Sequence, residues 1–297
     1  MTLLLGATGV LGLAIQAIWP EHSLLCTHFQ SASSSSIRFD VRKDTVCKIL
    51  ANCEHRPGVA IISLGITTID QCALNPATAS LTNVDGIIRL IQELVRLRIK
   101  PVFISSDAVF DGSQSMWSEE DTASPILVYG QHKLAVESYI RKLNVPWLIL
   151  RLPKIISTSA HPKCMLTGWL KALHMNNAIL CATDQYFTPI SNTDAALAIW
   201  RLIKTDATGL YHIAGQERLS RRALLSMVEI EFENYHSSQS VINNCLLSDI
   251  PVLEPRPIDS SLLTTRFLGL GLMHFETMQA SVKRAVETYF TLIREGH

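Results

Sequence analysis

Short apolar runs alternate along the chain with longer stretches in which apolar residues recur every three or four positions. The runs are typical of buried strands, and the periodic stretches are typical of helices that pack one face on a core. The pattern predicts strands at 2–5, 23–27, 59–64, 100–105 and 147–150, and helices at 10–18, 44–53, 77–97 and 128–143. Apolar strands separated by helices indicate an α/β fold, with a Rossmann-type, doubly wound parallel sheet.

Three glycines lie between the first predicted strand and the first predicted helix, at Gly6, Gly9 and Gly12 of GATGVLG. In such a unit the first glycine permits a tight turn, the second lets a diphosphate approach the main chain, and the third lets the helix pack close to the sheet. The helix N-terminus adds free N–H groups and a partial positive charge. The turn therefore predicts a dinucleotide contact, through Gly6, Thr8, Gly9, Val10, Leu11 and Gly12. A glycine-rich turn without a ligand is the alternative.

The end of the second predicted strand, CTHFQ at 26–30, contains no carboxylate to hold the ribose of NAD. His28 or Arg38 could instead meet a 2′-phosphate, which favours NADP(H) and leaves NAD(H) open. Asp40 and Val41 follow a serine cluster, SASSSS at 31–36, and would suit a contact with the adenine edge. An ordinary turn acid is an equal alternative for Asp40.

A tyrosine and a lysine are spaced four residues apart in YGQHK, at Tyr129 and Lys133. On a helix this spacing places both side chains on one face. A nearby ammonium favours the phenolate, so we expect it to lower the pKa of the phenol and make a general acid. Upstream, the strand that ends in ISSDAVFDG would place Ser105 and Ser106 in the ligand crevice, with a hydroxyl for a substrate carbonyl. Serines that only cap the next turn are the alternative.

After about residue 151 helices, histidines and prolines are interspersed with short strands such as 209–213. This change predicts an NAD(P)-binding Rossmann domain over residues 1–153. It predicts a mainly substrate-binding lobe over residues 154–297, interleaved with the last strands of the sheet.

The formal net charge of zero gives no basic excess for nucleic acid or an anionic membrane. No run reaches the roughly 18 apolar residues of a membrane span, and the apolar start lacks the basic region of a signal peptide. The seven cysteines are scattered without a CxxC pair, which favours a reducing compartment and excludes common metal-site spacings. We expect a soluble cytoplasmic protein with no metal site.

Together, GATGVLG, ISSDAVFDG and YGQHKLAVE resemble the extended short-chain dehydrogenase/reductases, and among them the dTDP-4-dehydrorhamnose reductase (RmlD-like) family. The resemblance continues through DQCALNPATASLTNV, DQYFTPISNTDAALAI, GLYHIAG and RPIDSSLL, so it covers nearly the whole chain.

The resemblance implies a reductase of a nucleotide-linked 4-keto deoxysugar that uses NADPH. It implies that Tyr129 protonates the substrate oxygen, that Lys133 binds the nicotinamide ribose and tunes Tyr129, and that Ser106 is the catalytic hydroxyl residue. It places Leu64 and Gly65 beside the diphosphate, Asn83 in the cofactor site and Val109 near the substrate. A homodimer is one possible assembly of the chain.

Several residues depart from the family pattern, and two others each have two alternative roles. Ala108 replaces an aromatic residue, SLGITT replaces an asparagine and small residues, and Lys154 lies where aromatic and glycine residues are commoner. Trp117 could be an aromatic lid on the substrate or a surface plug. Arg256 could hold a diphosphate with two hydrogen bonds or form a surface salt bridge.

Two other functions remain open. The family resemblance includes the regulatory β-subunit of methionine adenosyltransferase, which would bind the cofactor and a partner enzyme without turnover. The second of these functions is epimerisation or dehydration of a sugar by a protein with the same fold. Dehydration would use a carboxylate such as Asp107, but neighbouring strand residues face opposite sides, so we do not expect Ser106 and Asp107 to share the crevice.

Overall fold

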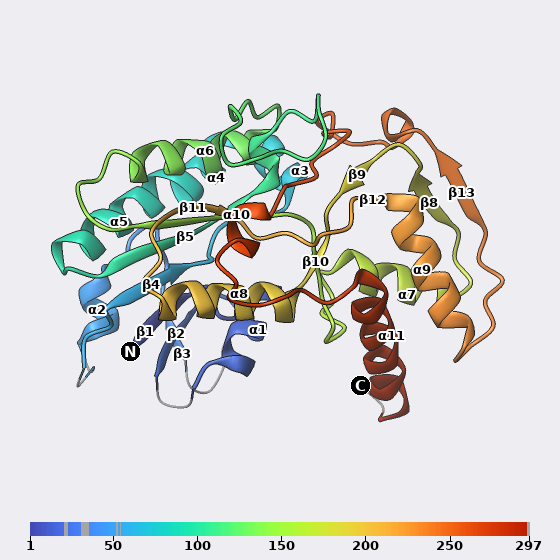
Figure 1. Cartoon of the computed structure of the whole chain (residues 1–297), viewed down its shortest axis with the longest axis horizontal. Helices are drawn as coiled ribbons and strands as arrows, with labels where there is room; N and C mark the ends of the chain where they lie inside the picture. The colour runs from blue at the N-terminus through green and yellow to red at the C-terminus, as the bar shows by residue number, and fades with distance from the viewer. Residues whose placement is uncertain (21–22, 31–35, 52, 54, 296–297) are drawn as a thin grey trace.

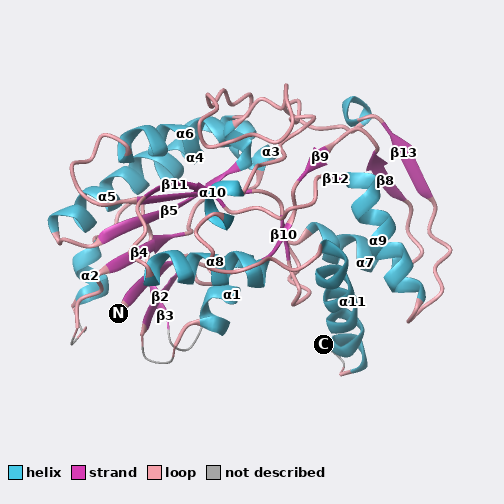
Figure 2. Ribbon diagram, viewed as in Figure 1, coloured by secondary structure: helices cyan, strands magenta, loops and turns pink. Residues whose placement is uncertain are grey.

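The computed structural model describes residues 1–20, 23–30, 36–51, 53 and 55–295. Its central feature is a sheet of seven parallel strands in the order β11-β6-β5-β4-β1-β2-β3 (Figures 1 and 2). The order reverses direction between β1 and β4, as it does in a doubly wound Rossmann fold, so the predicted fold class is confirmed. The strands are β1 (Thr2–Leu5), β2 (Leu24–His28), β3 (Ser36–Arg38), β4 (Val59–Ile62), β5 (Lys100–Ser106), β6 (Leu148–Leu152) and β11 (Gly209–His212).

Helices cover both faces of this sheet, which explains why its strands are apolar throughout (Figure 2). On one face, α1 (Val10–Ile18) and α8 (Asn192–Lys204) pack on Leu4, Ile61 and Val102. On the other face, residues such as Leu5 and Phe103 meet α2 (Val46–Leu50), α5 (Ile87–Arg96) and α6 (Val128–Ile140). Alternate residues of each strand therefore contribute to two separate cores.

The helix predicted at 77–97 is a continuous helical segment made of three parts. It consists of α4 (Pro76–Ser80), a π-helical turn η1 (Leu81–Gly86) and α5. A π turn widens the helix locally and rotates the side chains that follow, and such turns are frequent at functional sites. The periodicity predicted the helix but not this turn.

An edge strand of the sheet and a helix that follows β4 were not predicted. The strand β3 begins at Ser36, the last residue of the serine cluster expected to be a loop; positions 31–35 of that cluster lie outside the described residues. The helix α3 (Ile69–Leu74) follows β4 through an irregular segment.

A third apolar core lies in the C-terminal half, away from the sheet. It is formed by α7 (Met165–His174), α9 (Arg221–Glu233) and α11 (Met278–Arg294), with the parallel pair β8 (Ile179–Ala182) and β13 (Ile242–Cys245). The remaining short elements are β7 (Ile155–Ile156), β9 (Tyr186–Phe187), β10 (Ile190–Ser191), β12 (Leu219–Ser220), α10 (Thr265–Leu268), and the 3₁₀ turns η2 (Asp107–Val109) and η3 (Leu247–Asp249). The division of the chain at residues 153 and 154 stays a prediction.

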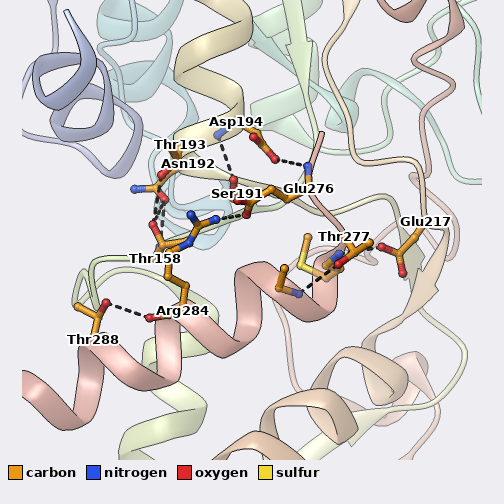
Figure 3. A network of polar contacts seen from close by, with 12 residues as sticks. Thr158, Ser191, Asn192, Thr193, Asp194, Glu217, Glu276, Thr277, Arg284 and Thr288 are labelled. Atoms are coloured by element: carbon orange, nitrogen blue, oxygen red, sulfur yellow. Dashed lines mark hydrogen bonds and ion pairs between the residues drawn. The ribbon is translucent and has the colours of Figure 1, made fainter. Parts of the chain in front are cut away.

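A polar network joins α8 and α11 to the segment that follows β7 (Figure 3). The N–H and the hydroxyl of Thr158 both donate to Asn192 Oδ1 at 3.0 Å. The N–H of Glu276 donates to Asp194 Oδ2 at 3.0 Å, and Glu276 forms an ion pair with Arg284. The network fixes Thr158 and the chain around it to the start of α8.

No helix in the described part of the chain is long and apolar enough to cross a membrane. Within the same residues, no group of three or more His, Cys, Asp or Glu side chains is placed to hold a metal ion.

Candidate active site

A cleft of about 960 Å³ opens where β1, β4, β5 and β6 end. The chain that leaves each of these strands contributes lining residues, among them Gly6, Leu64, Ser106 and Lys154. Carboxyl ends of parallel strands at the reversal of strand order are where ligands bind in open α/β sheets. The lining residues from β9 and α9 place the C-terminal half on the other side of the cleft.

The three glycines of the first turn have different roles in this structure. Gly6 adopts a φ of +97°, and a Cβ there would lie 2.7 Å from the Ser63 carbonyl oxygen. A Cβ on Gly12 would lie 2.3 Å from the Gly6 carbonyl oxygen, so Gly12 allows α1 to pack against the turn. Gly9 has open space around it and no side chain caps the helix that starts beside it. Gly6 and Gly9 line the cleft with Thr8, Val10 and Leu11, whereas Gly12 does not.

Beyond the glycine turn, the cleft is bordered by the ends of β2 and β3. His28, Phe29, Gln30 and Phe39 line it there. The Nδ1 atom of His28 lies 2.7 Å from the Ser36 hydroxyl. The guanidinium groups of Arg38 and Arg42 lie 5.9 Å and 5.5 Å from the centre of the Phe29 ring. Two guanidinium groups are therefore close to this end of the cleft, and Arg42 was not predicted.

Asp40 and Val41 are not among the residues that line the cleft, although the neighbouring Phe39 is, and their contact with the adenine edge stays a prediction. Asp40 is buried, and its carboxylate accepts hydrogen bonds from Arg42 Nε at 2.9 Å and Nη2 at 2.8 Å. The hydrogen bonds from Arg42 lower the pKa of Asp40 to about 2. Val41 is buried in the core beneath α5. Asp40 thus holds its own turn together in this structure.

Asn83 is also placed behind the cleft rather than in it. Its side-chain amide donates to the Ile66 carbonyl oxygen, and its Oδ1 accepts from the Ile66 N–H, both at 2.8 Å. Gly65 has a φ of +141°, and a Cβ there would lie 2.9 Å from Asn83 Oδ1. Asn83 therefore positions the loop that carries Leu64 and Gly65, which do line the cleft.

The structure brings Tyr129, Lys133 and Ser106 into the same cleft as the glycine turn. Tyr129 and Lys133 are one turn apart on α6, and Lys133 Nζ lies 5.7 Å from the centre of the Tyr129 ring. Lys133 Nζ donates to the Ile104 carbonyl oxygen at 2.7 Å. Ser105 also borders the cleft, but its hydroxyl donates to the buried carboxylate of Glu137.

The expected lowering of the Tyr129 pKa by Lys133 is wrong for this structure. Burial raises the pKa of Tyr129 above its ordinary value, and the carboxylate of Asp107 raises it further. A hydrogen bond with Ser106 opposes these effects without cancelling them. Burial lowers the pKa of Lys133 to about 8, against the opposing charge of Glu137. The phenol is therefore held in its protonated form at neutral pH.

Asp107 and Ser106 both line the cleft, contrary to the expectation that adjacent strand residues would face opposite sides. The reason is that β5 ends at Ser106 and Asp107 begins the turn η2, so the strand alternation no longer applies. The Ser106 hydroxyl donates to Asp107 Oδ1 at 2.8 Å, and the Ser260 hydroxyl donates to Oδ2 at 2.7 Å. Burial raises the pKa of Asp107.

Val109 and Trp117, both expected at the substrate, are buried core residues and are not among the residues that line the cleft. The Trp117 ring stacks on Phe110 at 4.4 Å between centres, and its Nε1 donates to the Asp259 carbonyl oxygen at 3.1 Å. Trp117 is thus neither a lid nor a surface plug. Its side chain packs in a small apolar cluster with Val109 and Leu262.

Arg256 lines the cleft and also forms an ion pair with Asp70 of α3. Its Nη1 atom is buried without a hydrogen-bond partner, as is the Nε atom of Arg221 at the start of α9. Arg221 was missed in the sequence, because nothing in the local pattern connects the start of a helix near residue 220 to the ends of β5 and β6. Lys154 was noticed only as a departure from the family pattern.

The chain resembles known proteins over nearly its whole length. The family model described as the RmlD substrate binding domain matches residues 1–291. A dTDP-4-dehydrorhamnose reductase of Sinorhizobium fredii is 24% identical over 98% of this chain and 97% of its own length. Methionine adenosyltransferase 2 subunit beta of Mus musculus is 24% identical, over 96% of this chain and 86% of its own length.

Solved structures show the same fold. The dTDP-4-dehydrorhamnose reductase of Bacillus anthracis, crystallised in complex with NADP, has a TM-score of 0.82 and 19% sequence identity. The match covers 95% of this chain and 97% of that one.

Proposed function

Because this chain belongs to the RmlD substrate binding domain family, we propose that it is an NADP-dependent reductase of a nucleotide-linked 4-keto deoxysugar. The proposed activity is the one for which the relatives called dTDP-4-dehydrorhamnose reductase are named. The observation that carries the proposal is that Tyr129, Lys133 and Ser106 line one cleft together with the glycine turn. A nucleotide-sugar ketone and a dinucleotide would share this cleft.

The described residues fit NADP(H), with NAD(H) as a second option. The glycine turn offers main-chain N–H groups at the uncapped start of α1, where a diphosphate is stabilised by the partial positive charge of the helix. His28, Arg38 and Arg42 would meet the 2′-phosphate at the end of β2. Lys133 would hold the nicotinamide ribose. When bound, the cofactor supplies the hydride.

In the proposed reaction, Tyr129 donates the proton that the substrate oxygen needs as the ketone becomes an alcohol. Its raised pKa keeps that proton in place until the oxygen becomes strongly basic. Ser106 would turn its hydroxyl from Asp107 to the substrate carbonyl and hold it for the transfer. The Lys133 ammonium would favour the phenolate that remains after the proton has left.

A second function is supported by the relatives named Methionine adenosyltransferase 2 subunit beta, which match the chain over a similar length. In that case the cleft would bind the cofactor, and a surface of the protein would bind a partner enzyme. The two proposals differ in turnover, because only the reductase consumes NADPH with a nucleotide 4-keto sugar.

We predict that Tyr129→Phe lowers kcat by roughly 10²- to 10⁴-fold, because it removes the proton donor without removing the ring. The affinity for NADPH should stay within about twofold of wild type. NADPH absorbance decay with dTDP-linked 4-keto-6-deoxysugars measures the first quantity, and titration of NADPH fluorescence measures the second.

Tyr139→Phe is the matched control, because Tyr139 lies on the same helix but packs against the core beneath the sheet. It should turn over at the wild-type rate. Equal rates for Tyr129→Phe and wild type would refute Tyr129 as the proton donor. Tight NADPH binding by the wild type without ketone reduction would instead favour the regulatory function.

A further inference from the structure

The connection between β7 and α7 borders the glycine turn. Residues 161–165 of this connection line the cleft together with Gly6, Thr8 and Gly9. The imidazole of His161 faces the turn itself, because it forms a hydrogen bond with the Thr8 main chain. A polar side chain from the C-terminal half therefore reaches the segment that leads into α1.

Hydrogen bonds within this connection hold His161 in place. The Ser157 hydroxyl accepts from the His161 N–H at 3.3 Å, and the Cys164 N–H donates to the His161 carbonyl oxygen at 2.9 Å. Thr158, three residues before His161, is bound to Asn192 at the start of α8 (Figure 3). A ligand at the turn would therefore meet an imidazole whose main chain is already ordered, which lowers the entropic cost of binding.

The ring proton of His161 lies on the nitrogen that meets the turn. Nδ1 accepts a hydrogen bond from the Lys163 N–H at 3.1 Å, so Nδ1 carries no proton. Desolvation, and to a smaller extent the Lys163 charge, lower the pKa of His161, so the ring is neutral at neutral pH and its proton is on Nε2. The Nε2–H group therefore donates to the Thr8 main chain, and it can equally donate to an anionic oxygen that arrives there.

The two diphosphates that the proposed function requires would lie at different places in the cleft. The glycine turn, with the open space at Gly9 and the uncapped start of α1, suits the diphosphate of the dinucleotide. The guanidinium nitrogens of Arg221 and Arg256 that lack a hydrogen-bond partner suit the diphosphate of the nucleotide sugar. His161 belongs to the first place, because its ring contacts the turn itself.

We propose that His161 is a cofactor-binding residue, whose Nε2–H group donates to the diphosphate of the dinucleotide at the glycine turn. The proposal rests on the NADP(H) binding of the proposed function and adds to it a contact from the C-terminal half of the chain. Bound in this way, the diphosphate lies between the start of α1 and the connection from β7 to α7.

Fragments of the cofactor test which part of it His161 binds. NADP⁺ and 2′-phospho-ADP-ribose both contain the diphosphate, whereas adenosine 2′-monophosphate lacks it, and each is titrated into the protein by calorimetry. His161→Ala should weaken the binding of the first two ligands by roughly 10- to 100-fold, the range of a hydrogen bond to a charged group. The variant should bind adenosine 2′-monophosphate within about twofold of wild type, because this ligand does not reach the glycine turn.

Two further variants serve as controls. His161→Gln should keep most of the affinity for NADP⁺, because its side-chain amide offers an N–H group in place of Nε2–H. His274→Gln replaces an exposed histidine that is not among the residues that line the cleft. It should bind all three ligands as the wild type does.

Unchanged binding of NADP⁺ by His161→Ala, or an equal loss for adenosine 2′-monophosphate, would overturn the proposal and leave the reductase function standing. A loss for NADP⁺ without one for 2′-phospho-ADP-ribose would overturn it as well, since His161 would then contact the nicotinamide ring. Weaker binding of dTDP by His161→Ala would assign the imidazole to the diphosphate of the nucleotide sugar instead. An affinity for NADP⁺ that depends on His161, in a protein that reduces no ketone, would refute the reductase function alone.

Discussion

At the scale of single residues, the three glycines of the first turn are required for different reasons. Gly6 is required by its backbone conformation, and Gly12 by the closeness of α1 to the turn. Gly9 is surrounded by open space, because a Cβ there would lie 3.9 Å from its nearest neighbour, the Gly6 carbonyl oxygen. Of the three positions, Gly9 is the one left open for a ligand.

We therefore predict opposite outcomes for alanine at two of these glycines. Gly12→Ala should lower the free energy of unfolding by about 1–3 kcal/mol or more, because the new methyl group overlaps main-chain atoms of the turn. Gly9→Ala should change it by at most about 1 kcal/mol and weaken NADPH binding. Urea denaturation and NADPH titration measure the two effects. Equal stability of the two variants would contradict the packing role of Gly12.

The sequence identified Tyr129 and Lys133 because their spacing on a helix fixes their common face. It did not predict the pKa of Tyr129, since that depends on burial and on Asp107, which approaches from a different element. Trp117 was misjudged for a similar reason. An aromatic residue in a polar loop gives no sign that Phe110 and Asp259 will enclose it.

At the scale of elements, α6 is attached to the sheet by a buried ion pair. Glu137 of α6 accepts hydrogen bonds from Arg151 of β6, at 3.0 Å from Nε and 2.7 Å from Nη2, and from the hydroxyl of Ser105 of β5. Glu137 and Arg151 are almost completely inaccessible to solvent. The pair thereby sets how the Tyr129 face of the helix is presented to the cleft.

Glu137→Ala should lower the free energy of unfolding by about 3–5 kcal/mol, because it leaves the Arg151 charge buried without its partner. Glu229→Ala breaks a half-buried ion pair with Arg222 on α9 and is the control, with an expected loss below about 1 kcal/mol. Chemical denaturation of both variants makes the comparison. A loss for Glu137→Ala as small as that of the control would show that the buried pair does not hold α6 in place.

At the scale of the whole molecule, a histidine at the end of the edge strand β11 is buried between segments that are far apart in the chain. His212 of β11 is fully buried, with Nδ1 3.1 Å from the Trp117 carbonyl oxygen and Nε2 3.3 Å from Arg151 Nη1. Nε2 therefore accepts from the guanidinium and Nδ1 donates. Burial, and secondarily the Arg151 charge, lower the pKa of His212 to about 3.

This lowered pKa predicts a loss of stability in acid. Between the ordinary histidine pKa of about 6.5 and a pH of about 3, the unfolded chain binds a proton at His212 that the folded chain does not. The contribution of His212 to the free energy of unfolding is complete above a pH of about 6.5. Below that pH it falls by up to about 1.4 kcal/mol per pH unit. In urea denaturation from a pH of about 7.5 to about 5.0, His212→Gln should lose less stability than wild type over the same interval. If the free energy of unfolding depended on pH in the same way in His212→Gln and in wild type, His212 would not be the source of the loss in acid.

The sequence by itself determined the alternation of strands and helices, the glycine turn and the Tyr129–Lys133 face. Each of these depends on the period of a helix or strand, or on the conformational freedom of a residue, and such properties act over a few neighbouring positions.

The tertiary structure decided the rest. It alone placed Arg221 and Lys154 beside the ends of β5 and β6, turned Asp107 into the cleft and buried Asp40 behind it. The place of Arg221 depends on contacts between segments that are far apart in the chain, and the others depend on where each strand ends and on what encloses the residues that follow it. The charge, burial and proton affinity of a side chain depend on everything around it, and a local pattern does not contain those surroundings.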